Sequence, residues 1–170
     1  MTSIKSGDDA DSEFELDPKL KVVAKCIEQG LTFWKEKRGQ HLAPARDQFS
    51  LRETRHFAPH LQILELLDNG RAYRQRLTGT ALVAQLKYDP TGRVYDDSSA
   101  DAVVRRMLRA IGWVVEHKTP LRTVAHRTAL SGQDFMTHET IFLPLSSDGK
   151  TIDMMAVVSA FTPVSKSKQD

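Results

Sequence analysis

The sequence predicts an α+β domain built around an antiparallel sheet. Two amphipathic helical stretches, at residues 19–39 and 101–118, are separated by two short strand-like segments, and three more strand-like segments follow the second helix. Strands joined by tight turns pair antiparallel, whereas a doubly wound parallel sheet needs a helix between successive strands. The 170 residues suffice for one domain with its own core.

The first 16 residues are predicted to form a disordered acidic tail. Residues 1–17 hold one lysine against six carboxylates, so they carry −5 in a chain of formal net charge +2, and the rest carries +7. Segments this polar bury too little apolar surface to fold. A second short tail is expected at residues 164–170.

An N-terminal helix is predicted over residues 17–39. Asp17 can accept a hydrogen bond from the free amides of a helix start, Pro18 suits the first helical position, and Gly39 follows a basic last turn, where helices often end. Its apolar stripe consists of Leu20, Val23, Ile27, Leu31 and Trp34. This stripe must be buried, either on the chain's own sheet or on a second copy of the chain.

Residues 61–79 are predicted to form an antiparallel hairpin. An apolar run ends in Asp68-Asn69-Gly70, a strong turn signal, and the following segment alternates between two faces. One face carries Tyr73 and Gln75, and the other carries Arg74 and Arg76. A single helical turn is expected at residues 80–87.

The second amphipathic helix is predicted over residues 101–118, with Ser98 or Ser99 as its cap and Pro120 after its end. Its buried stripe is Val103, Met107, Ala110, Ile111 and Val114. Three strands are then expected at residues 121–130, 135–146 and 151–161. A tight turn at Ser147-Asp148-Gly149 joins the last two.

Several residues carry a family resemblance in their order and spacing over residues 20–160. They are Trp34, Arg38-Gly39, Pro44, Arg46, Arg74, Gly79-Thr80, Asp89, Thr91-Gly92-Arg93, Leu143-Pro144-Leu145-Ser146, Asp148-Gly149 and Asp153. With the element order, they make the chain resemble a subfamily of stand-alone bacterial PAS domains. One departure is that the aspartate-proline step usual after the arginine is missing, and the next proline is Pro59.

The resemblance implies a PAS-like five-stranded antiparallel sheet with strand order 2-1-5-4-3 and helices on one face. The N-terminal amphipathic helix is an addition, and the PAS-like domain is expected at residues 40–163. The resemblance further implies a non-catalytic sensory or regulatory module of bacterial signal transduction. Such a module acts by binding a small molecule, by binding proteins, or by both.

PAS pockets lie between the inner face of the sheet and the helices. The polar or aromatic residues expected near such a pocket are Tyr73, Gln75, Trp113, His126 and Phe135. The alternative is that these side chains only fill the core. We also expect a homodimer through the N-terminal stripe, and a signalling protein partner, because no kinase, cyclase or DNA-binding segment fits in the predicted tails.

Other chemistries have little support in the sequence. One cysteine and six scattered histidines do not supply the closely spaced ligands of a zinc site, so no metal is expected. Cys26 lies on the N-terminal helix, outside the sheet-and-helix core that would hold a photoreactive flavin, so flavin photochemistry is not expected. The sequence does not identify a cofactor. The arginines are dispersed, so no nucleic acid is expected. No apolar stretch is long enough to span a membrane, and a cytoplasmic location is the default.

An enzyme is the alternative function. A curved antiparallel sheet with helices also occurs in the cone-shaped isomerase and dehydratase fold, in which an aspartate and a histidine in the pocket move protons. Asp153 and His126 are the candidates here. The element order argues against this fold, because it places most helices before the long strands.

Overall fold

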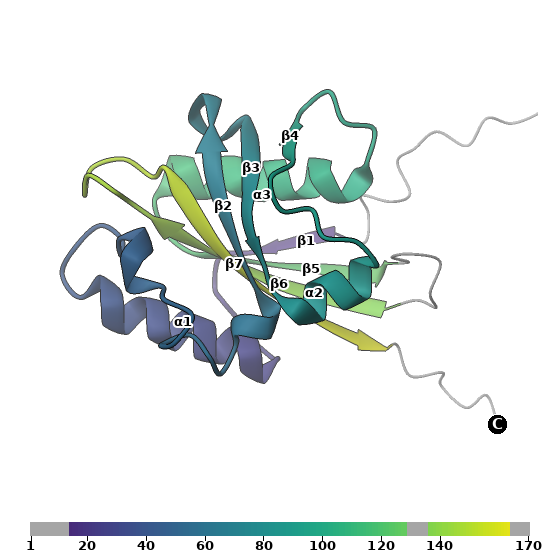
Figure 1. The fold of residues 1–170 in the computed structure, drawn as a ribbon, viewed down its shortest axis with the longest axis horizontal. Helices are drawn as coiled ribbons and strands as arrows, with labels where there is room; N and C mark the ends of the chain where they lie inside the picture. Colours follow the sequence, from purple (N-terminus) through teal and green to yellow (C-terminus); the bar gives the residue numbers. More distant parts are fainter. Residues whose placement is uncertain (1–13, 129–135, 164–170) are drawn as a thin grey trace, which may run out of the picture.

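A computed structural model describes residues 14–128 and 136–163, which form one antiparallel sheet with helices on both of its faces (Figure 1). The strands are β1 (Phe14–Asp17), β2 (Leu61–Leu67), β3 (Ala72–Thr78), β4 (Val94–Asp96), β5 (Leu121–Thr128), β6 (Met136–Leu145) and β7 (Met154–Pro163). The helices are α1 (Lys25–Arg38), α2 (Thr80–Leu86) and α3 (Ala102–His117), with short 3-10 turns η1 (Arg46–Gln48), η2 (Ala58–His60) and η3 (Asp68–Gly70).

The sheet has seven strands in the order β1-β5-β6-β7-β2-β3-β4. The prediction of five strands is therefore wrong, and the full strand order differs from the predicted one. The two additional strands are the short edge strands, β1 beside β5 and β4 beside β3. If the five strands between these edges are numbered 1 to 5 in chain order, they lie in the order 2-1-5-4-3 when the sheet is read from β3 to β5.

The N-terminal helix begins at Lys25 and not at Asp17. Asp17 ends β1, and its carboxylate accepts hydrogen bonds from the backbone N–H groups of Lys19 and Lys21. Leu20 has a φ of 56°, which no helix tolerates. Residues 14–16, expected in the tail, form most of β1. The rest of both predicted tails, 1–13 and 164–170, lies outside the described residues.

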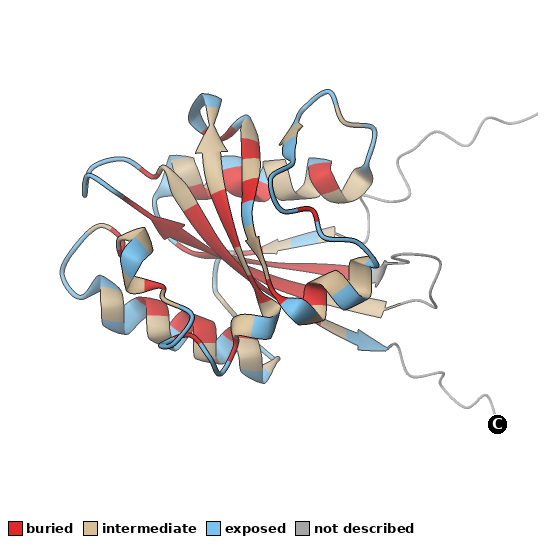
Figure 2. Cartoon of the chain, in the orientation of Figure 1, coloured by how far each residue is buried: buried red, intermediate tan, exposed pale blue. Residues whose placement is uncertain are grey.

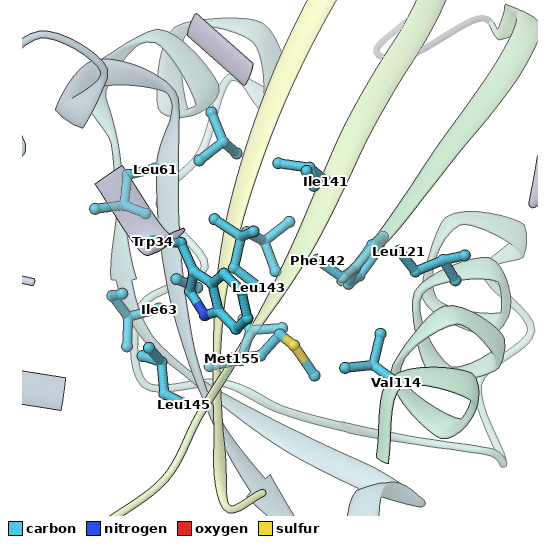
Figure 3. Packing of buried hydrophobic residues seen from close by; sticks show 14 of the residues in the cluster. Trp34, Leu61, Ile63, Val114, Leu121, Ile141, Phe142, Leu143, Leu145 and Met155 are labelled. Atoms are coloured by element: carbon cyan, nitrogen blue, oxygen red, sulfur yellow. The ribbon is translucent and has the colours of Figure 1, made fainter. Parts of the chain in front are cut away.

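Helix α1 packs on the chain's own sheet, on the face that we call the outer face. Ile27, Leu31 and Trp34 are buried, and the indole N–H of Trp34 donates to the carbonyl oxygen of Pro144 at 2.8 Å. Figure 3 shows Trp34 against Leu143, which marks this face on β6. Helix α1 approaches β7 closely at Gly30, because a Cβ there would lie 2.8 Å from Val158 Cγ2 and would force that side chain to shift.

Helices α2 and α3 cover the opposite, inner face, which carries Phe142 on β6. Val114 of α3 points toward Phe142 and Leu121 in Figure 3, and Gln85 of α2 donates to Met136 Sδ at 3.4 Å. Buried residues run along the central strands between the two helical layers (Figure 2). The helices thus cover both faces, with α1 on the face that the middle helices leave open.

The other predicted elements are present with shifted bounds, but residues 146–153 connect β6 to β7, so the prediction of a tight turn at Ser147-Asp148-Gly149 is wrong. The β2–β3 hairpin and the three C-terminal strands are confirmed, and so are α2 and α3. The cap of α3 is Asp101, whose carboxylate accepts the N–H of Val103 at 2.8 Å, so the prediction of Ser98 or Ser99 is wrong. Asp101 immediately precedes the helix, so its carboxylate lies within hydrogen-bonding distance of the free amides of the first turn.

Candidate functional site

A group of buried polar side chains lies on the otherwise apolar inner face. Thr140 of β6 stands between Thr123 of β5 and Ser159 of β7, and the three side chains are 1–5% exposed. The hydroxyl oxygens of Thr140 and Ser159 are 3.3 Å apart, and Thr140 Oγ1 lies 2.9 Å from His138 Nε2. We call Thr123, Thr140, Ser159 and His138 the inner polar cluster. Thr140 hydrogen-bonds with both His138 and Ser159, which lowers the cost of burying these three side chains.

His138 is held as a neutral imidazole at neutral pH. Burial lowers its pKa to about 4, and the guanidinium of Arg106 on α3 acts in the same direction. The ring is half-buried and stacks on Phe161, with ring centroids 4.3 Å apart. A neutral imidazole both donates and accepts a hydrogen bond. The inner polar cluster therefore offers hydrogen bonds without a net charge.

Gln75 occupies a second polar position on the inner face. Its amide nitrogen, almost fully buried, donates to Gln62 Oε1, to the carbonyl oxygen of Leu77 and to Thr78 Oγ1, each at 3.0 Å. Two amide hydrogens serve three acceptors, so this group has no hydrogen left for a ligand. Gln75 thus fastens β3 to β2.

Two of the five residues expected near a pocket share the inner face of β3. Besides Gln75, Tyr73 is buried there, its hydroxyl donates to Met107 Sδ at 3.5 Å, and burial raises its pKa. Trp113 is half-buried and stacks on His117 near the end of α3, at 4.0 Å between centroids. His126 is exposed, and Phe135 lies outside the described residues. A role of these five residues in ligand binding stays a prediction.

The inner polar cluster is not apparent from the sequence. Thr123, Thr140 and Ser159 stand singly in three strands, where threonine and serine are ordinary strand residues. Only the register across β5, β6 and β7 brings them together. The alternation of His138, Thr140 and Phe142 along β6 is the one signal that could have placed these side chains on one face.

The residues considered for metal or acid–base chemistry do not meet. In residues 14–128 and 136–163, no group of three or more histidine, cysteine or acidic side chains could hold a metal ion. Asp153 accepts the backbone N–H of Ser147 beside the end of β6 at Leu145. His126 follows Ala125, which pairs with His138 toward the other end of β6. The aspartate–histidine pair of the alternative enzyme is therefore not formed.

A second polar group is buried on the outer face, below the start of α1. The guanidinium of Arg122 contacts the carboxylates of Asp17 at 3.0 Å and Glu139 at 3.1 Å. Burial by itself would raise the pKa of Asp17, but the amides of Lys21 and Lys19 and the Arg122 guanidinium more than offset this, and the pKa is lowered. All three charged residues are buried, with 6–8% of their surface exposed.

The residues expected to bind a second copy are largely covered within one chain. Ile27, Leu31 and Trp34 are buried and Leu20 is half-buried, whereas Val23 is 81% exposed. While α1 is docked, only Val23 of this stripe is freely available to another molecule. The homodimer itself stays a prediction.

A family model described as PAS domain matches residues 24–159, from the residue before α1 into β7. No curated protein matches the chain. Within the described part of the chain, no helix is long and apolar enough to cross a membrane.

Proposed function

Because the chain belongs to the PAS domain family, we propose that it is a non-catalytic sensory and regulatory module of signal transduction. It binds a small molecule at the inner face of the sheet, and ligand binding changes its interaction with a partner protein. The observation that carries the proposal is the inner polar cluster, a set of buried hydroxyl groups and a neutral imidazole on an apolar face. Ligand sites combine a mostly apolar lining with a few such polar groups.

The chemistry of the cluster supports a neutral ligand. Because the pKa of His138 is lowered to about 4, the imidazole provides no positive charge near pH 7. Phe142, Val157 and Leu121 provide apolar surface on the same face. A small apolar molecule with one hydroxyl or carbonyl group fits these partners.

The regulatory output is assigned to the N-terminal segment on the outer face. Ligand binding shifts the population between docked and undocked states of α1, because the ligand has different affinities for the two states. Contact with a signalling protein or with a second copy in a homodimer then uses the exposed side chain of Val23, just before the start of α1. A cytoplasmic location fits this role and belongs to the proposal.

A thermal-shift screen with neutral metabolites tests the proposal. We expect at least one compound to raise the melting temperature of the wild-type chain and to lose this effect in Thr140→Val, which keeps the shape of the side chain and removes its hydroxyl. Thr137→Val, a half-exposed neighbour on the same strand, is the matched control. A compound that stabilises all three proteins equally would place the ligand elsewhere, and a screen without any stabilising compound would count against ligand binding.

A further inference from the structure

The junction between β1 and α1 is held in place by acidic side chains. Residues 18–24 belong to neither a strand nor a helix. The Asp17 carboxylate accepts the N–H groups of Lys19 at 3.0 Å and Lys21 at 2.8 Å. Glu139 Oε1, on β6, accepts the N–H groups of Val23 and Ala24, both at 3.1 Å. Two carboxylates thus bind four backbone amides of this short segment.

Arg122 joins the two carboxylates into one buried cluster. Its Nη1 donates to Asp17 Oδ2 and its Nη2 donates to Glu139 Oε2. Side-chain exposures of 7–10% mean that water screens these charges only weakly. Loss of Arg122 would leave two buried carboxylates without a counter-charge, and loss of either carboxylate would break a buried ion pair and weaken the hydrogen bonds that this carboxylate accepts from backbone amides. The three side chains therefore act as a unit.

Part of this arrangement lies outside the family match. The match begins at residue 24, so it excludes β1 and Asp17 but includes Arg122 and Glu139. Arg122 on β5 therefore binds a carboxylate, that of Asp17, from a segment that precedes the matched residues. If that segment leaves, the backbone edge of β5 that pairs with β1 is uncovered.

We infer that Asp17, Arg122 and Glu139 form an ionic latch that holds residues 14–28 on the sheet. With the latch closed, β1 stays paired and the start of α1 stays docked. With one charge removed, this segment opens while the rest of the sheet stays folded. The regulatory role of this latch rests on the proposed function, because opening would change the surface that a partner protein contacts. The latch itself can be tested without a ligand.

Cys26 is a built-in reporter of this opening. It is the only cysteine of the chain, it lies in the first turn of α1, and it is half-buried. Burial and the nearby Glu139 carboxylate raise its pKa, so substitution of Glu139 would also change the reactivity of the thiol directly. Asp17 is not among the groups that shift the pKa of Cys26. Asp17→Asn is therefore the cleaner variant.

The experiment compares the rate of Cys26 labelling by a thiol reagent in native buffer. We expect Asp17→Asn to label about tenfold faster than wild type or more. Glu53→Gln is the matched control, because the Lys37–Glu53 ion pair tethers the other end of α1 at an exposed site. That variant should stay within about twofold of wild type. A wild-type labelling rate in Asp17→Asn would overturn the latch.

Hydrogen exchange separates opening of the latch from general unfolding. In Asp17→Asn, the amides of residues 14–28 should exchange faster, while those of β2 and β7 keep their wild-type protection. Equal acceleration in β2 and β7 would show that the cluster only stabilises the whole fold, which contradicts a latch. If Asp17→Asn does not fold, amide hydrogen exchange of the wild-type chain tests the latch instead. Residues 14–28 must then open as one unit with less protection than β6 and β7, and equal protection would overturn the inference. Neither readout depends on the ligand screen.

Discussion

Glu139 and Thr140 are consecutive residues of β6 that serve opposite faces of the sheet. The Glu139 carboxylate accepts the N–H groups of Val23 and Ala24 on the outer face. The Thr140 hydroxyl lies 3.3 Å from that of Ser159 on the inner face. One strand thus carries both the hydrogen bonds that hold the N-terminal segment and the centre of the proposed ligand site.

Gly79 and Gly112 should respond in opposite directions to substitution by alanine. A Cβ at Gly79 would lie 2.3 Å from the carbonyl oxygen of Pro59 and 2.5 Å from that of Ala58, and backbone atoms cannot easily move aside. We expect Gly79→Ala to lower the free energy of unfolding by about 2–4 kcal/mol. Gly112 lies in α3 with nothing within 4 Å of a Cβ. Gly112→Ala should raise stability by about 0.5–1 kcal/mol.

Urea denaturation of the two glycine variants checks this pair. An unchanged midpoint for Gly79→Ala would contradict the close approach of η2 to the start of α2. A loss of stability in Gly112→Ala would contradict the open surroundings of that position.

Gln75→Ala should destabilise the β2–β3 hairpin. The substitution removes the shared donor of Gln62 Oε1, Thr78 Oγ1 and the Leu77 carbonyl, which lie at a half-buried place. We expect a loss of about 1–3 kcal/mol in the free energy of unfolding. Gln40→Ala, at an exposed loop position, is the control and should change it by less than about 0.5 kcal/mol. Equal effects of both variants would contradict the assigned role.

The stability of the protein should depend on the protonation of His138. Its pKa is about 4 in the folded chain and near 6.5 when unfolded. The unfolded chain therefore binds more protons between these values, and stability falls as the pH is lowered from 6.5 toward 4. The loss attributable to His138 is on the order of 2–3 kcal/mol over this window.

His138→Gln should flatten this pH dependence, and His41→Gln, at an exposed position, should keep it. Denaturation curves measured from pH 4.5 to 7 give the comparison. The window lies above the lowered pKa of Asp17, so titration of that carboxylate contributes little. A slope in His138→Gln as steep as in wild type would show that other groups cause the effect.

The regular parts of the fold were accessible from periodicity. The spacing of Ile27, Leu31 and Trp34 identified the buried stripe of α1, and Asp68-Asn69-Gly70 identified the β2–β3 turn. The start of α1 was misplaced because an aspartate that accepts nearby amides is typical of a helix cap and equally of a turn. In the structure, Asp17 makes these bonds in a turn.

The candidate site and the latch could not be predicted because both depend on register between distant strands. Strand β1 has four residues in an acidic context, so no alternation distinguished it from the tail. Arg122 and Glu139 looked like ordinary polar strand residues until the pairing of β1, β5 and β6 placed them beside Asp17. The order of residues along one short strand does not show which residues of a distant strand will lie opposite them in the sheet.

Native mass spectrometry distinguishes a ligand-sensing PAS module from one that binds no small molecule. The full-length chain and Thr140→Val are each incubated with a small-molecule extract of cells and sprayed under non-denaturing conditions. We expect a discrete mass addition on the wild-type chain that is lost or strongly reduced in Thr140→Val. The bare chain mass in both proteins, or the same addition on both, would contradict a ligand site at the inner polar cluster.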